Sequence, residues 1–508
     1  MSNVAYPKSL TAGSNISPTH ITAAILIAAS SKRKFFIIVR LINLVLLVRK
    51  FFIKVQNAVL FFIIMLQYML KKYLEAQMKK YFINTYGCQM NVHESEKLAG
   101  ILRQRGYVAA KSNEEADVIL LNTCCIRETA ETRVLGNLGI IKKIKEKRPD
   151  VIVGICGCMP QKKGTAEMLK KRCPFIDIIF GTHNMYKLGE YLDLVEQCGK
   201  KVLEIWDSEG NIEYAPIFRD GKVNAWVNIM YGCDNFCSYC IVPYVRGRER
   251  SRDFDEIVSE VRLLIESGYK EVTLLGQNVN SYGGGSPQFS KLLRALSNFN
   301  GEYRIKFMTS HPKDLTLDVV EAMASSDKIA NYIHLPVQAG SDRILKLMNR
   351  KYTSGEYLEK IKMIRSIIPD VGISSDLMVG FPTETEEDYL CSENLIKEVK
   401  YNNLFTFIYS RRSGTVADKM DGQVDIKTKT DRIERLIKLQ FDIGNELARS
   451  YVGKTYRVLC DTVNGEIGYG KSSCDKSISF KANESTVGQF VDVKITQAKN
   501  NKLIGEIV

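Results

Sequence analysis

Three cysteines lie close together in the stretch YGCDNFCSYCIVPYVRGRERSR, where Cys233, Cys237 and Cys240 form a C-x-x-x-C-x-x-C pattern. A closed zinc site needs four ligands, commonly from two cysteine pairs or from a cysteine pair and a histidine pair. No second pair of this kind and no H-x-x-x-H sequence occurs in the chain. Three thiolates on one loop suit a 4Fe-4S cluster with one iron open to another ligand. The spacing therefore predicts an iron-sulfur site that can bind a small substrate at its open iron.

A second set of three cysteines precedes this motif, and each member follows an apolar run. Cys88 follows YFINTYG, Cys124 follows DVILLN and Cys158 follows VIVGIC. Because the runs alternate with helical stretches, they predict a βαβαβ unit with a parallel sheet, in which ligands gather at the carboxyl ends of the strands. Three thiolates that meet there could hold a second cluster. Ordinary buried cysteines are the alternative, since a free cysteine behaves as a small apolar side chain.

Two further cysteines and the helix boundaries complete the expectations for this first region. We expect Cys156 to pack in the core and Cys125, one position after Cys124, to point away from the site. The first helix, in NVHESEKLAGILRQRGY, is expected to start at Asn91 or Ser95 and to stop at Gly106. A long helix from Arg127 and another toward Arg172 follow.

Six apolar runs in the middle of the chain predict a second, larger α/β region. Each is separated from the next by enough residues for a helix, so residues 225–410 are interpreted as six βα units that form an open barrel. The first run leads directly into the three cysteines of the C-x-x-x-C-x-x-C motif. The runs are AWVNIM, EVTLLG, YRIKFMTS, NYIHLP, VGISSDLMVG and NLFTFIYS.

The last part of the chain changes to short apolar runs separated by turn residues, which predicts about five short strands in a small β domain. The runs are TYRVLCDTV, GEIGYGKS, SISFKA, QFVDVKITQA and KLIGEIV.

The formal net charge of +14 is concentrated at the N-terminus, where residues 1–77 hold ten basic residues against the single acidic residue Glu75. Whole-chain charge is therefore weak support for a nucleic-acid partner. Thirteen cysteines in a chain of 508 residues without a recognisable cleavable signal indicate metal or redox sites and a reducing, cytoplasmic location.

The apolar N-terminal runs have competing interpretations. Basic residues interrupt them, so a membrane anchor is disfavoured, and organelle-targeting peptides are richer in Arg and Ser. We interpret residues 1–77 as an extension outside the functional fold. In this interpretation the polypeptide sequence was assigned from a translation start upstream of the functional one. That start is expected at one of three methionines, Met65, Met69 or Met78.

Beyond these patterns, the chain from about Lys79 to Val508 resembles the radical S-adenosylmethionine (SAM) methylthiotransferases. The likeness rests on two independent cysteine sets together with the blocks around them. These blocks are TYGCQMN, LNTCCIRETAE, GCMPQ, GCDNFCSYCIVPYVRGRERSR, LLGQNVNSYG, SHPKDL, HLPVQAGSDRILKLMNRKYT, DLMVGFPTETEED and FIYSRRSGT. The resemblance implies a domain with an auxiliary cluster at residues 79–196, a radical SAM core with a partial (β/α)6 barrel at 219–449, and a small β-barrel RNA-binding TRAM domain at 452–508.

The resemblance also implies roles for individual residues. Cys233, Cys237 and Cys240 would hold the 4Fe-4S cluster that binds SAM, and Cys88, Cys124 and Cys158 an auxiliary 4Fe-4S cluster. Tyr239 would lie near the adenine of SAM.

Polar residues at the other predicted strand ends are candidates for SAM or RNA contact, although such side chains often only satisfy backbone groups. They are Gln277, Asn278, Ser310, His311, His334, Gln338 and Asp376. Every second residue from 246 to 252 is an arginine, and these side chains could follow phosphates along an extended segment; a solvated face is the alternative. They are Arg246, Arg248, Arg250 and Arg252.

The activity that the resemblance implies is installation of a methylthio group at C2 of N6-dimethylallyladenosine next to the anticodon of tRNA. One cluster would reduce SAM to yield a 5′-deoxyadenosyl radical, and the other would present sulfur. The implied partners are tRNA, an electron donor and a sulfur source, with no DNA, no membrane and a monomeric protein. Alternatives within the family act on threonylcarbamoyl-adenosine in tRNA or on a ribosomal-protein aspartate. A non-catalytic iron-sulfur electron carrier, an RNA-binding protein and a zinc module are the alternatives from other classes.

Overall fold

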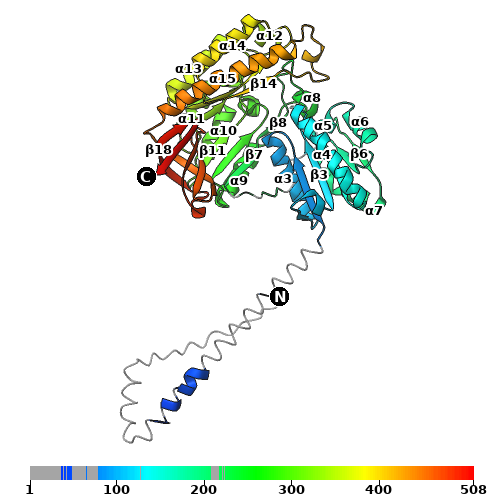
Figure 1. Ribbon diagram of the computed structural model, residues 1–508, viewed down its shortest axis with the longest axis vertical. Helices are drawn as coiled ribbons and strands as arrows, with labels where there is room; N and C mark the ends of the chain where they lie inside the picture. The colour runs from blue at the N-terminus through cyan, green and yellow to red at the C-terminus, as the bar shows by residue number, and fades with distance from the viewer. Residues whose placement is uncertain are drawn as a thin grey trace, which may run out of the picture. The chain divides into compact units, whose positions relative to one another are not determined.

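The computed structural model describes residues 36–37, 39–41, 43–48, 65, 78–125, 128–207, 217–219, 221 and 223–508. The chain divides into two compact units, residues 1–78 and 79–508 (Figure 1). In the first unit the described residues before Met78 are helical, with exposed apolar side chains such as Phe36 and Leu47. Most of the segment interpreted above as an extension, including Met69, lies outside the described residues. None of the helices in the described ranges has the length and apolar character needed to cross a membrane.

The second unit begins with a six-stranded parallel sheet in the order β2-β1-β3-β4-β5-β6. Apolar clusters fill both of its faces. The strands are β1 (Lys80–Thr85), β2 (Val108–Ala109), β3 (Val118–Thr123), β4 (Ile152–Gly157), β5 (Ile178–Phe180) and β6 (Val202–Glu204). The helices are α3 (Gln89–Gln104), α4 (Glu128–Lys147), α5 (Cys158–Gln161), α6 (Thr165–Arg172) and α7 (Leu188–Cys198).

This sheet confirms the predicted parallel unit and extends it. The three predicted strands are β1, β3 and β4, and the short strands β2, β5 and β6 add three more. Helix α3 begins at Gln89 with Cys88 as its N-cap, so the predicted start at Asn91 or Ser95 is wrong. Gly106 follows the helix with φ +84°, as expected for the residue that ends it.

Six parallel strands form the central α/β region, as predicted. They are arranged in two three-stranded sheets, β11-β10-β7 and β12-β13-β14, joined by an isolated parallel bridge between Ile305 and Ile329. One large apolar cluster contains buried side chains from both sheets and from the helices that surround them. The strands are β7 (Asn224–Asn228), β10 (Glu271–Leu275), β11 (Arg304–Phe307), β12 (Tyr332–His334), β13 (Gly372–Val379) and β14 (Asn403–Ile408).

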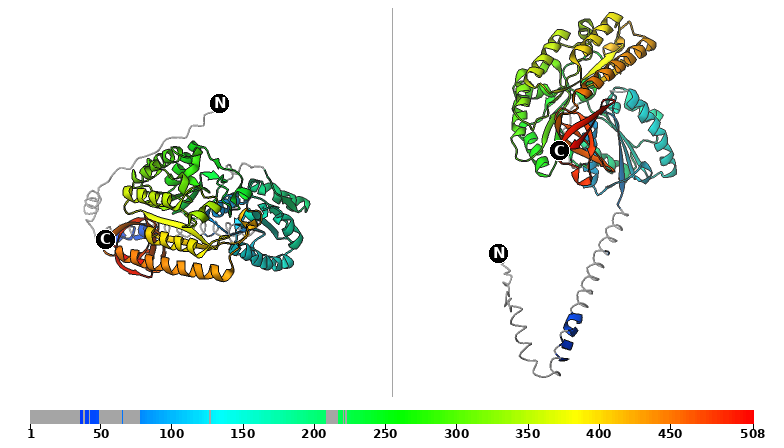
Figure 2. Two further views of the ribbon diagram at one scale, coloured as in Figure 1. Left: turned by 90° about the horizontal axis from the view of Figure 1, so that it is seen from above. Right: turned by 60° about the vertical axis from the view of Figure 1, so that its left-hand side comes forward.

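Helices alternate with these strands, and the longest, α15 (Ile426–Ser450), lies along β14 (Figure 2). A short hairpin of β8 (Met230–Tyr231) and β9 (Arg250–Ser251) brackets the three-cysteine motif. The remaining helices are α8 (Val242–Arg246), α9 (Phe254–Glu266), α10 (Gln288–Ser297), α11 (Leu317–Ala324), α12 (Asp342–Leu347), α13 (Ser354–Ile367) and α14 (Glu386–Val399).

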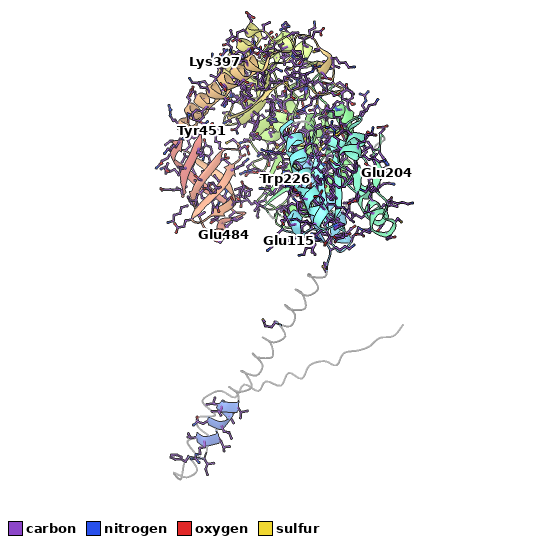
Figure 3. The ribbon with its side chains drawn as sticks, turned by 45° about the vertical axis from the view of Figure 1, so that its right-hand side comes forward. Glu115, Glu204, Trp226, Lys397, Tyr451 and Glu484 are labelled. Atoms are coloured by element: carbon purple, nitrogen blue, oxygen red, sulfur yellow. The ribbon has the colours of Figure 1, made fainter. Side chains whose placement is uncertain are left out.

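The C-terminal strands close into a five-stranded barrel in the order β15-β16-β17-β19-β18, which confirms the expectation of about five short strands. Tyr451 caps α15 where the chain enters this barrel, and Tyr451 and Glu484 flank the barrel at opposite ends (Figure 3). The strands are β15 (Thr455–Asn464), β16 (Ile467–Ser472), β17 (Ser477–Lys481), β18 (Phe490–Lys499) and β19 (Lys502–Ile507).

Candidate functional site

Cys88, Cys124 and Cys158 follow the carboxyl ends of three adjacent strands, β1, β3 and β4. Thr85 is paired with Asn122 and Thr123 with Gly157, so the cysteines leave the sheet almost level with one another. Parallel strands place the groups at their carboxyl ends along one edge. The sheet therefore gathers at a single edge three cysteines that are far apart in sequence.

Gly87 explains how the first two of these cysteines come so close. Its φ is +116°, and a Cβ at this position would lie 2.4 Å from Cβ of Cys124 and 3.0 Å from its Sγ. Only glycine tolerates both the backbone conformation and the contact. The turn before Cys88 is therefore pressed against the side chain of Cys124.

Two other cysteines lie near this edge, and only one behaves as the sequence indicated. Cys156 is buried in the core of the sheet, as expected. Cys125 was expected to point away, but it is buried beside Cys158 in a small cluster with Ile241 and Val245. A hydrogen bond to Cys125, together with burial, raises the pKa of the Cys158 thiol. The prediction that Cys125 points away from the site is therefore wrong. Ile241 and Val245, just before and within α8, pack against it.

The second cysteine set lies on the loop between β8 and α8. Gly232, with φ +72°, directly precedes Cys233, and a Cβ on it would lie 1.9 Å from the carbonyl oxygen of Arg248. The amide of Cys233 donates to the carbonyl of Gly247 across 3.3 Å. This close backbone contact closes the loop that carries all three cysteines.

Two polar side chains donate to the sulfurs of this loop. Nδ2 of Asn235 lies 3.4 Å from Sγ of Cys233, and Nη1 of Arg350 lies 3.5 Å from Sγ of Cys237. Arg350 is buried and is held in place by the carbonyl of Pro336 at 2.8 Å. Sequence reasoning did not single out Arg350, although it stands in the quoted block HLPVQAGSDRILKLMNRKYT.

Burial also changes the pKa of two of these thiols. It raises the pKa of Cys233, and it raises the pKa of Cys240 to about 12 with a further contribution from neighbouring Cys237. Metal binding releases protons from such thiols. The loop thus offers three sulfur atoms, two of which face a side-chain hydrogen-bond donor.

Several predicted polar residues at the neighbouring strand ends have buried atoms without a hydrogen-bond partner among the described residues. They are Oε1 of Gln277, Oδ1 of Asn278 and Oγ of Ser310. Asn228, at the end of β7, was missed by sequence reasoning; it is fully buried, and neither its side-chain oxygen nor its side-chain nitrogen has a partner. Buried polar groups are rarely left unpaired, so these atoms indicate a place for a polar ligand.

The remaining candidate residues have hydrogen-bond or packing partners. Nδ1 of His334 lies 2.8 Å from Oγ of Ser374, and its Nε2 lies 3.6 Å from Oδ1 of Asp376. Gln338 is buried with φ +73°, and its backbone pairs with β13 beside Asp376. His311 accepts from the amide of Lys313, and burial lowers its pKa to about 2, so it caps the turn as a neutral side chain. Tyr239 packs, half-buried, against the barrel core.

The four arginines do not form one phosphate-binding row. Arg246 is buried against Glu94 and Asn91, and Arg252 donates to Glu260 and to the carbonyl of Asn228. The prediction of an extended, one-sided row is therefore wrong for these two, because Val242–Arg246 is helical and Gly247 turns the chain.

The other two arginines lie near aromatic rings. Arg250 is placed over the ring of Tyr231 at 5.9 Å. Arg248 is exposed, lies over the ring of Phe236 at 4.7 Å and pairs with Asp234. Of the four side chains, Arg248 is best placed to meet a phosphate.

Among the described residues, no three Cys, His, Asp or Glu side chains converge on a point that could hold one metal ion. A zinc ion needs such convergence, whereas a cubane cluster binds each cysteine at a different iron. None of the thirteen cysteines, all of which lie in the described part of the chain, forms a disulfide.

Three family models match successive parts of the chain. The model described as "Uncharacterized protein family UPF0004" matches residues 80–181, that of the radical SAM superfamily matches 227–391, and that of the TRAM domain matches 449–508. The first covers strands β1 to β5 of the six-stranded sheet together with Cys88, Cys124 and Cys158. Radical SAM membership implies a 4Fe-4S cluster and SAM as cofactors.

Comparison with characterised sequences decides the family. The tRNA-2-methylthio-N6-dimethylallyladenosine synthase of Clostridium beijerinckii is 52% identical over 439 residues, which are 84% of this chain and 96% of that protein. The chain belongs to the tRNA-2-methylthio-N6-dimethylallyladenosine synthases. It is thus a radical SAM tRNA methylthiotransferase. The synthase of Acetivibrio thermocellus is 46% identical over 437 residues, covering 85% of this chain and 91% of that one.

A solved structure shows the same fold at low sequence identity. The radical SAM methyltransferase TsrM from Kitasatospora setae, solved with a tryptophan substrate and a SAM analogue, aligns with a TM-score of 0.50 and 11% identity. The match covers 77% of this chain and 79% of that one. At this identity the likeness bears on the fold alone.

Proposed function

We propose that this synthase adds a methylthio group to C2 of N6-dimethylallyladenosine next to the anticodon of a tRNA, with two 4Fe-4S clusters and SAM as cofactors. One contact supports the arrangement most directly. The side chain of Gln277, which follows β10, contacts the side chain of Met90, two residues after Cys88. The edge that carries the first cysteine set therefore touches the mouth of the barrel that carries the second.

We assign Cys233, Cys237 and Cys240 to the SAM-binding cluster and Cys88, Cys124 and Cys158 to an auxiliary cluster. When bound, the two clusters supply, respectively, an electron for reductive cleavage of SAM and sulfur for the transfer. Arg350 and Asn235 donate hydrogen bonds toward the sulfurs of Cys237 and Cys233.

The polar groups at the barrel mouth would bind SAM. The unpaired atoms of Gln277, Asn278 and Ser310 are available to its amino, carboxylate and ribose groups. Half-buried Tyr239 lies on the three-cysteine loop, directly before Cys240, and would contact the adenine. There are three further candidates: His334 ends β12, Gln338 lies beside β13, and Asp376 lies within β13.

The tRNA would approach the same mouth. A base that reacts inside a barrel has to leave its stack, and single-stranded loops allow this at low cost. Arg248, stacked on Phe236 beside exposed Tyr244, offers a charge and two aromatic rings next to the cluster loop. We propose that this group contacts the anticodon loop.

The remaining parts of the proposal concern the division of the chain and its partners. The auxiliary domain would span residues 79–196, the radical SAM core 219–449 and the TRAM domain 452–508, with 1–77 outside the functional fold. An electron donor and a sulfur source would complete the reaction, and the protein would act as a cytoplasmic monomer. Thirteen cysteines without a disulfide among the described residues support this location.

Nucleoside analysis of tRNA tests the proposal. A strain that lacks its own synthase but contains N6-dimethylallyladenosine is complemented with this chain or with its Cys233→Ala variant. The wild-type chain should convert the nucleoside to its 2-methylthio form, and the variant should not. Unchanged N6-dimethylallyladenosine with the wild-type chain, or a new methylthio group on threonylcarbamoyl-adenosine or a ribosomal-protein aspartate instead, would refute the assignment.

A further inference from the structure

Arg246 follows the loop that carries Cys233, Cys237 and Cys240, and the position of its side chain differs from the expectation. It lies six residues after Cys240, at the end of the short helix α8, and was predicted to contact RNA. Its side chain instead turns inward and is 4% exposed. A guanidinium rarely enters the interior unless it is paired.

The partners of Arg246 belong to the other cysteine set. Nη1 of Arg246 lies 2.6 Å from Oε1 of Glu94, and Nη2 lies 3.2 Å from Oε2 of the same carboxylate. The Glu94 side chain is 1% exposed. Such a two-point pair between a guanidinium and a carboxylate fixes direction as well as distance.

A third contact joins Arg246 to a cluster cysteine through one atom. Oδ1 of Asn91 accepts from Nη2 of Arg246 at 3.0 Å and lies 3.8 Å from Sγ of Cys88. The other side-chain atom, Nδ2, donates to the carbonyl of Tyr86 at 2.8 Å, on the turn before Cys88. Asn91 therefore binds the α8 segment on one side and the Cys88 turn on the other.

The same segment also covers the third cysteine of the auxiliary set. Val245 packs against Cys158 and Cys125, and its carbonyl accepts from Oγ1 of Thr182 at 2.7 Å. Helices α8 and α5, which begins with Cys158, lie side by side (Figure 1). Residues 241–246 thus contact the surroundings of both Cys88 and Cys158.

A second buried contact ties the other end of the cluster loop to the same helix. Nζ of Lys97, one turn beyond Glu94 on α3, donates to the hydroxyl of Tyr231 at 3.0 Å. Tyr231 stands two residues before Cys233. Helix α3, whose N-cap is Cys88, therefore holds the chain both before and after the three-cysteine motif.

We propose that Arg246 is a positioning residue that sets the distance and orientation of the auxiliary cluster relative to the SAM cluster. The inference rests on the proposed function, which requires both clusters in one enzyme. A buried ion pair often stabilises a fold no better than apolar side chains would, but it permits fewer arrangements. Transfer of a group between two clusters depends strongly on their relative arrangement. The formation of each cluster depends on it far less.

The test compares Arg246→Lys, Arg246→Gln and the charge exchange Glu94→Arg with Arg246→Glu, with Arg105→Gln as the matched control. Arg105 is exposed and caps α3 at the end away from Cys88. Full-length proteins are reconstituted anaerobically. Iron and sulfide per chain, the magnetic coupling between the two reduced clusters, and the amount of methylthiolated tRNA nucleoside per 5′-deoxyadenosine are measured.

Arg246→Gln should keep wild-type iron, sulfide and 5′-deoxyadenosine formation, but change the coupling between the clusters. Its product per 5′-deoxyadenosine should fall about tenfold or more, since displacement of reacting groups by about 1 Å can cost a factor of about 100. In Arg246→Lys the product per 5′-deoxyadenosine should fall less. The double variant with Glu94→Arg and Arg246→Glu should recover part of the loss.

Two results would overturn the proposal. One is a wild-type coupling and product ratio in both single variants. The other is an equal loss of iron, 5′-deoxyadenosine and product in all three Arg246 variants, which would make the pair merely structural. If instead the wild-type chain makes 5′-deoxyadenosine but no methylthiolated nucleoside, the proposed function itself fails, whatever the variants do.

Discussion

Arg350 donates from Nη1 to Sγ of Cys237 across 3.5 Å, although 113 positions separate the two residues in the chain. Nη2 of Arg350 is fixed by the carbonyl of Pro336, and its Nε by the hydroxyl of Tyr352 at 2.8 Å. Strands β12 and β7 belong to different halves of the barrel, so the fold brings a buried positive charge to the middle cysteine of the loop. A hydrogen bond to a cluster sulfur is one of the features that set its reduction potential.

Replacement of Arg350 by Gln should therefore make the SAM cluster harder to reduce. Removal of a hydrogen bond to a charged group costs about 1.5–3 kcal/mol. If about 1.4 kcal/mol of this favours the reduced form, the one-electron potential should shift by about 60 mV toward more negative values. Redox titration followed by electron paramagnetic resonance measures the shift.

The neighbouring exposed residue provides the control for this variant. Lys351→Gln removes a positive charge one position away, on the surface, and should leave the potential unchanged. Equal potentials for Arg350→Gln and the wild type, with the cluster intact in both, would contradict the role given to Arg350.

Gly87→Ala should remove the auxiliary cluster and spare the SAM cluster. The added Cβ would lie 2.4 Å from Cβ of Cys124, so the two cysteines could no longer keep their places. Gly106→Ala is the matched control: φ there is also positive, at +84°, but a Cβ would meet nothing within 4 Å. Both variants carry backbone strain of about 1–3 kcal/mol.

The iron content of the two variants distinguishes the effect of backbone strain from the effect of the clash between the added Cβ and Cys124. Gly106→Ala should keep the iron content of the wild type, and Gly87→Ala should lose about half of it, as expected when one of two 4Fe-4S clusters is missing. A full iron complement in Gly87→Ala would show that the contact with Cys124 does not shape the site.

Arg248→Gln should weaken tRNA binding and lower its dependence on salt. A phosphate contact contributes about one unit to the slope of log K against log salt concentration, so the slope should fall by about 1. Arg105→Gln is a suitable control, because Arg105 caps α3 at the end away from Cys88, about 24 Å along the helix. Unchanged affinity and slope in Arg248→Gln, measured by binding titrations at several salt concentrations, would exclude the phosphate contact.

Much of the fold could be predicted from the sequence because its strands are long, apolar and regularly spaced. The cysteines at the ends of β1, β3 and β4 were placed correctly for this reason. The strands β2, β5 and β6 have only two or three residues each, and such short elements are held by their neighbours in the sheet rather than by their own pattern.

The errors in the site have equally local causes. The alternating arginines suggested an extended strand, but Pro243 lies in the first turn of a helix and Gly247 turns the chain at its end, so Arg246 faces inward. Cys125 was expected to point away, but side chains of the α8 segment meet it. Arg350 and Asn228 are functional candidates only because distant strands converge, and no local pattern marks them.

Iron content per chain after anaerobic reconstitution tests the central claim most directly. The wild-type protein should bind about eight iron atoms, and each of two triple alanine variants, at Cys88, Cys124 and Cys158 or at Cys233, Cys237 and Cys240, should bind about four. A wild-type content of about four, or a wild-type content in either triple variant, would contradict the account of two clusters held by separate sets of three cysteines.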